Sequence, residues 1–182
     1  MCNPACTFRA RVLASVGGWR DGPFPEDYDL FLRLAARGAV VEKRPEVHHA
    51  WRMHAHNSTK VDPRFARDRH AEMKARALRE RFTLDARSVF VAGAGKEGGR
   101  IGRALLACGI APARYFDVSK ARIGRRRHGA IVDDAAQLER ARAEDPASFV
   151  IGAVGTSGAR GVLREALTRA GYVEGTSFVV VC

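Results

Sequence analysis

The sequence contains no run of about 18 apolar residues, so it lacks a segment that could cross a membrane as a helix. Its first residues do not have the basic and then apolar order of a secretory signal. Cysteine is scarce, and the four cysteines form no C-x-x-C pair, which argues against a structural zinc site and favours reduced thiols. These absences predict a cytoplasmic protein, and contact with the inner face of the membrane remains open.

The 182 residues suffice for one sizeable domain or two small ones, and 46% hydrophobic with 28% charged residues is typical of globular proteins. The net charge of +11 divides into +6 for residues 1–87 (17 basic, 11 acidic) and +5 for residues 88–182 (14 basic, 9 acidic). An even spread argues against a nucleic-acid-binding tail, so no specific nucleic-acid partner is expected. The densest basic cluster, Arg122 to His128, fits a solvated loop, with contact to phosphates as the alternative.

The most distinctive stretch of the first half runs from Gly17 to Arg33. A Gly-Gly-Trp turn ending at Trp19 is followed by Glu26-Asp27, which open a helix that Gly38 is placed to end. Acidic residues in a first helical turn often serve only as caps, because they complement the helix dipole. On the local sequence, Glu26 and Asp27 could therefore be structural.

This stretch, together with Trp51-Arg52-Met53-His54, resembles family 2 glycosyltransferases over residues 3–60. The resemblance implies the acceptor-side half of their GT-A fold and an inverting sugar transfer. It implies Asp27 as the catalytic base beside Glu26, and a donor, diphosphate or acceptor role for Trp19, Arg52 and His54. His54 would lie near a divalent metal, Mg or Mn, in the complete enzyme.

A carboxylate at a helix start suits this chemistry, since an inverting transfer needs a base within hydrogen-bond reach of the acceptor hydroxyl. The nucleotide-sugar-binding half with its metal-binding D-x-D does not precede the stretch, and Asp27-Tyr28-Asp29 belongs to the helix start. The sequence therefore predicts an incomplete GT-A acceptor half, inactive without a missing N-terminal half. Its partners in the complete enzyme would be a nucleotide sugar and a glycan or lipid-linked acceptor of the cell envelope.

Hydrophobic patterns predict a short helix over residues 9–16, the helix after Glu26, strands over 39–43 and 47–53, and a charged helix from about 62 to 81. A change to the apolar run Val89-Phe90-Val91-Ala92 places a domain boundary near residues 83–87. The predicted domains are therefore 1–84 and 88–182.

The apolar run leads directly into Gly93-x-Gly95-x-x-Gly98 and a helix over 99–108. A following strand, 114–118, carries Asp117, 19 positions after Gly98 and close to the offset of a ribose-binding acid. Strand, turn and helix in this order predict a Rossmann-type turn whose backbone N–H groups can approach a phosphate. Purely architectural glycines are the competing interpretation.

Strands over 129–132, 149–154 and 178–181 alternate with helices over 134–143 and 159–170, which predicts a small Rossmann-like parallel-sheet domain. This part resembles the C-terminal extensions of some bacterial family 2 glycosyltransferases and the N-terminal halves of sugar O-acyltransferases. The alternative function is a nucleotide- or sugar-nucleotide-binding module without catalysis of its own.

Overall fold

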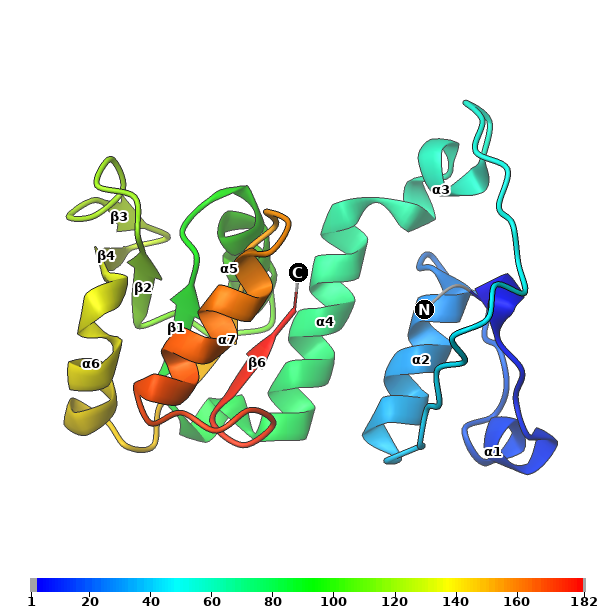
Figure 1. Cartoon of the computed structure of the whole chain (residues 1–182), viewed down its shortest axis with the longest axis horizontal. Coiled ribbons are helices and arrows are strands. Elements are labelled where there is room, and N and C mark those ends of the chain that lie inside the picture. Colours follow the sequence, from blue (N-terminus) through cyan, green and yellow to red (C-terminus); the bar gives the residue numbers. More distant parts are fainter. Residues whose placement is uncertain (1–2, 182) are drawn as a thin grey trace. The chain divides into compact units, whose positions relative to one another are not determined.

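The computed structural model describes residues 3–181 and divides the chain into two compact units, Met1–Met73 and Lys74–Cys182 (Figure 1). The division lies inside the helix α4 (Arg67–Phe82), whereas the sequence placed a boundary at residues 83–87. Within residues 3–181, no helix is both long and apolar enough to cross a membrane. The two units are described separately.

The second unit is built on one sheet, whose strands lie in the order β3-β4-β2-β1-β5-β6. All neighbouring pairs are parallel except β3 with β4. Without the short β3, the remaining strands follow the order 3-2-1-4-5 along the chain, which is the Rossmann order with its switch point between β1 and β5. The strands are β1 (Val89–Ala92), β2 (Arg114–Asp117), β3 (Arg126–Arg127), β4 (Ala130–Asp134), β5 (Phe149–Gly152) and β6 (Phe178–Val180).

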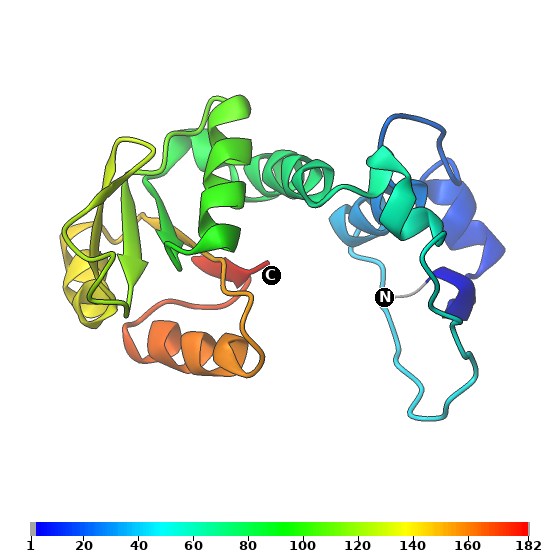
Figure 2. The same ribbon diagram turned by 90° about the horizontal axis from the view of Figure 1, so that it is seen from above.

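Helices cover both faces of this sheet, and Figure 2 shows α5 and α7 on opposite sides. The connection from β2 to β4 has no helix and forms a loop with the short strand β3. The α/β, mostly parallel architecture expected from the sequence is confirmed; the antiparallel β3 was not predicted. The helical elements are η3 (Leu84–Ala86), α5 (Lys96–Ala107), η4 (Ala135–Gln137), α6 (Leu138–Glu144) and α7 (Ala159–Arg169).

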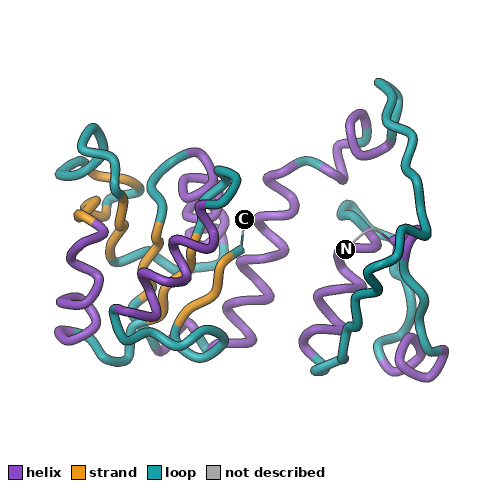
Figure 3. Tube along the Cα trace, viewed as in Figure 1, coloured by secondary structure: helices purple, strands orange, loops and turns teal. Residues whose placement is uncertain are grey.

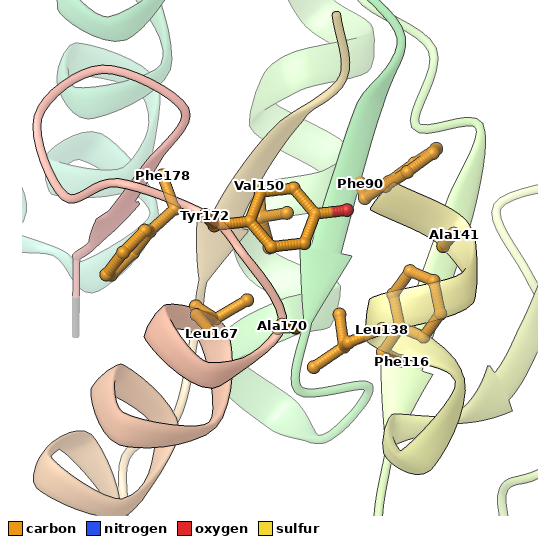
Figure 4. Packing of buried hydrophobic residues seen from close by; sticks show 10 residues of the cluster. Phe90, Phe116, Leu138, Ala141, Val150, Leu167, Ala170, Tyr172 and Phe178 are labelled. Carbon is orange, nitrogen blue, oxygen red and sulfur yellow. The ribbon is translucent and has the colours of Figure 1, made fainter. Parts of the chain in front are cut away.

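The core of the second unit forms because the central strands are apolar on both faces, as a sheet covered by helices requires. On one face, Phe90 and Val150 pack with Leu138 of α6 and Leu167 of α7 (Figure 4). On the other face, Phe149 of β5 meets the ring of Phe82 at 4.5 Å between ring centroids. Each fully buried large side chain contributes about 1.5–3 kcal/mol, so these layers fix the strand ends that carry the turns.

The first unit has a much smaller core, in which Val16 packs with Leu30, Phe31 and Leu34 of α2. The spacing of these residues confirms the amphipathic helix predicted after Glu26. Its helical elements are η1 (Asn3–Ala5), α1 (Ala10–Ser15), α2 (Glu26–Ala36), α3 (Ser58–Val61), η2 (Pro63–Phe65) and the first turns of α4.

The strands predicted over residues 39–43 and 47–53 were wrong, because residues 39–56 form neither helix nor strand (Figure 3). Val40 is 97% exposed and Val47 is 91% exposed, so the apolar residues that suggested strands are not buried. A strand is stable only when a neighbouring strand takes up its backbone hydrogen bonds, and the described part of the first unit offers none.

Candidate functional site

The glycine turn after β1 lies at the switch point of the sheet, and two of its glycines are required by packing. The Gly93 N–H donates to the Phe116 carbonyl at 2.7 Å, and Gly93 has φ +105°. A Cβ at Gly93 would lie 2.5 Å from the Ala153 carbonyl oxygen, and one at Gly98 would lie 1.7 Å from the Gly93 carbonyl oxygen. Gly93 and Gly98 therefore allow strand β1, helix α5 and the neighbouring turn to approach closely.

Gly95 differs from these two glycines. It precedes the first residue of α5 with φ −76°, a value that any residue adopts. A Cβ at Gly95 would have its nearest neighbours, atoms of the Arg122 guanidinium, 3.9 Å away. Neither φ nor packing within residues 3–181 requires glycine here, at the N-terminus of α5.

Asp117 ends β2 beside this turn and is 6% exposed. Its Oδ2 accepts a hydrogen bond from the Ala94 N–H at 2.7 Å, and its Oδ1 accepts one from the Ser119 N–H at 2.8 Å. Arg122 donates to both oxygens at 3.2 Å. The predicted ribose-binding acid thus ties the glycine turn to the end of β2, and its acceptor positions are already used.

A second glycine-rich turn follows β5 on the other side of the switch point. The Ala153 N–H donates to the Ala92 carbonyl at 2.7 Å, and Gly158 with φ +77° precedes α7. A Cβ at Gly155 would lie 3.0 Å from Cγ of Glu97, whose carboxylate accepts a hydrogen bond from Arg100 at 2.7 Å. Two turns therefore meet at the carboxyl ends of β1 and β5, where open α/β sheets bind ligands.

Tyr115 and His128 form a polar pair beneath α5 that sequence reasoning missed. The Tyr115 hydroxyl lies 2.8 Å from Nδ1 of His128, and both approach Gly102, where a Cβ would lie 1.9 Å from that hydroxyl. Burial raises the pKa of Tyr115 to about 12. Burial, and then the positive charges of Arg127 and Arg103, lower the pKa of His128. The available signal was a tyrosine next to Phe116 in a strand that the sequence pattern had already predicted.

In the first unit, Arg33 organises the Gly-Gly-Trp turn. Its guanidinium donates to Asp29 at 2.7 Å, to the Gly18 carbonyl at 2.8 Å and to the Val16 carbonyl. Asp27 accepts a hydrogen bond from the Tyr28 N–H at 2.7 Å at the start of α2. The sequence pattern from Gly17 to Arg33 is thus explained by a turn held on a helix.

The other residues singled out from the sequence do not gather around Asp27. Within the described part of the first unit, no hydrogen bond or ion pair joins Asp27 to Trp19, Arg52 or His54. All three are exposed, and Trp19 meets the ring of Phe8 edge-on at 5.7 Å between centroids.

The Glu26 carboxylate has one buried oxygen, Oε2, without a hydrogen-bond partner among residues 3–181. Over the same range, no three His, Cys, Asp or Glu side chains are grouped so that they could hold a metal ion. The metal expected near His54 was implied only for the complete enzyme, and the described residues do not test it.

Comparison with known proteins gives matches only among solved structures; no protein-family model and no curated protein matches the chain. The crystal structure of UDP-D-quinovosamine 4-dehydrogenase from Vibrio fischeri is 20% identical with a TM-score of 0.45, covering 53% of this chain and 78% of that one. RSP, a Rex-family repressor, in complex with β-NADH is 18% identical with a TM-score of 0.44, covering 63% of this chain and 62% of that one. RSP in complex with β-NAD⁺ and operator DNA is 18% identical with a TM-score of 0.44, covering 62% of this chain and 58% of that one.

The chain spans less than two thirds of the RSP chains, and at these identities the likeness concerns the fold alone. The resemblance to glycosyltransferases over residues 3–60 was wrong, because the strands of the expected acceptor half do not form in the described residues. The catalytic roles of Asp27 and Glu26, and the donor-side roles of Trp19, Arg52 and His54, rested on that resemblance and lose their basis with it.

Proposed function

We propose that the second unit is a Rossmann-like module that binds a nucleotide across the carboxyl ends of β1 and β5, with no catalysis of its own. One observation carries the proposal: Gly95 is a glycine that neither its φ nor its neighbours require. A bound phosphate would explain a glycine at this position, because a side chain would keep the phosphate from contacting the backbone N–H groups at the start of α5.

Two further features support this site. The strand order puts the switch point between β1 and β5, and glycine-rich turns follow both strands. The N-terminus of α5, a helix of 12 residues, lies directly after Gly95, and its dipole favours an anionic group there. The ligand class is a nucleotide, with dinucleotides and sugar nucleotides both included.

Isothermal titration of the full chain tests the proposal, using NADH, NAD⁺, NADP⁺, ATP and UDP-glucose up to about 1 mM. A ligand present at 100 times its Kd stabilises the folded unit by about 2.7 kcal/mol, so hydrogen exchange in the Gly93–Gly98 peptide should slow as well. Gly95→Val should abolish binding by filling the approach to the backbone.

The unliganded Gly95→Val protein is its own folding control. A Cβ at Gly95 has no neighbour closer than 3.9 Å, and the change replaces a glycine at the N-cap of α5, so the stability of the variant should fall by no more than about 1 kcal/mol. The proposal would be contradicted if none of these nucleotides bound the wild-type chain, or if Gly95→Val bound them as tightly as the wild type.

A further inference from the structure

The loop that connects β2 to β4 begins at the carboxyl end of β2 and carries a concentrated positive charge. Where a Rossmann fold usually places a helix, this chain has a short loop and β3. Residues 118–127 contain one lysine and four arginines, and no acidic residue: Lys120, Arg122, Arg125, Arg126 and Arg127. Such a local excess attracts an anionic ligand group and opposes a cationic one.

The carboxylate of Asp117 already accepts hydrogen bonds from other groups of the protein. A ribose-binding acid must offer free acceptor positions to the 2′- and 3′-hydroxyls. A carboxylate has about four lone-pair positions, and those of Asp117 receive the Ala94 and Ser119 N–H groups and two contacts from Arg122. A ribose diol at this place would therefore have to displace Arg122.

Arg122, in contrast, has donors to spare. Its side chain is 49% exposed, and within residues 3–181 its guanidinium donates to Asp117 through one nitrogen, NH1. The guanidinium lies over Gly95, since a Cβ there would be 3.9 Å from both its central carbon and its second terminal nitrogen. Asp117 orients the planar group, which can pair with a phosphate through two parallel hydrogen bonds.

We infer that the nucleotide site selects a ligand with an additional phosphate at the β2 edge, a 2′-phosphorylated dinucleotide of the NADP(H) class, and that Arg122 determines this specificity. The inference rests on the proposed function and names the ligand class of that same site. Asp117 is a positioning residue for Arg122.

The test compares matched ligand pairs on the full chain by isothermal titration at one fixed ionic strength: NADP⁺ with NAD⁺, and 2′,5′-ADP with 5′-AMP. In each pair, we expect the 2′-phosphorylated ligand to bind at least about tenfold more tightly, as one well-made charge-assisted contact allows. Arg122→Ala should lower NADP⁺ affinity about tenfold or more and leave NAD⁺ affinity within about threefold.

Arg125→Ala is the matched control, because it removes the same charge from the same exposed loop without removing a contact to Asp117. It should leave the NADP⁺-to-NAD⁺ ratio unchanged. Equal or tighter binding of NAD⁺, or an Arg122→Ala variant that weakens both dinucleotides equally, would overturn the inference while nucleotide binding stands. If no nucleotide binds, the proposed function fails together with the inference.

Discussion

Replacing Asp117 separates a structural carboxylate from a ligand-binding one. In Asp117→Ala, the Ala94 N–H loses its acceptor within the core, since Ala94 is 1% exposed. An unsatisfied buried donor costs about 1–3 kcal/mol, and the half-buried Ser119 N–H adds about 1 kcal/mol. Arg122 is half exposed and returns to water, so no buried charge is left unpaired. The expected loss is therefore about 2–4 kcal/mol.

Asp117→Asn should cost about half as much, because an amide keeps one acceptor oxygen and can satisfy one of the two N–H groups. Both losses are measured from hydrogen exchange of the β1 and β5 peptides, which report the unfolding of the second unit alone. Asp133→Ala is a suitable control, because Asp133 lies in β4 opposite Phe116 and forms no side-chain hydrogen bond with residues 3–181.

A ribose-binding role predicts a different result. In that case Asp117→Ala would weaken nucleotide binding, and the stability of the unliganded protein would remain within about 0.5 kcal/mol of the wild type. Exchange rates in the β1 and β5 peptides that match those of the Asp133→Ala control would refute the structural interpretation of this carboxylate.

Two other substitutions test the remaining polar contacts. Burial raises the pKa of Tyr115 from 10 to about 12, so its contribution to folding is complete below pH 10 and falls by about 1.4 kcal/mol per pH unit between 10 and 12. Tyr115→Phe should remove that part of the pH dependence in urea titrations followed by circular dichroism, and an identical slope would contradict it. Arg33→Ala should destabilise the first unit by about 2–3 kcal/mol, because it loses its bonds to Asp29 and two carbonyls. Trp19 and Trp51 both lie in the first unit, so their fluorescence reports its unfolding. Arg37→Ala, at an exposed position, is the control. Equal unfolding midpoints for the Arg33→Ala and Arg37→Ala variants would contradict a stabilising role of Arg33.

The strands of the second unit could be predicted because their burial on both faces leaves a continuous apolar run. Val89–Ala92 and Phe149–Gly152 are buried along their whole length, and flanking turn residues mark where they end. Strand β3 could not be predicted in the same way. It consists of Arg126 and Arg127 at the edge of the sheet, where a hydrogen-bonded neighbour decides the conformation and apolar burial contributes little.

The first half was misjudged because a local pattern was taken as a sign of a larger assembly. Val40 and Val47 lie in segments with strand-like composition, but a strand needs a partner that composition cannot supply. The pattern from Gly17 to Arg33 has a local explanation instead: Arg33 reaches back to the carbonyls of the turn. The spacing of Asp29 and Arg33, four residues apart in one helix, was a readable signal of that contact.

The candidate nucleotide site illustrates why a motif can be recognised before its parts are understood. Gly93, Gly95 and Gly98 are equivalent in the sequence pattern, yet their surroundings differ in kind. A Cβ at Gly93 or Gly98 would strike a backbone oxygen, so selection for folding alone would retain these two. Of these three positions, only Gly95 would accept an added methyl group without a clash in the unliganded protein. The loss of ligand binding with little loss of stability is therefore expected at Gly95 alone, and it is the property that separates a working phosphate turn from an architectural one.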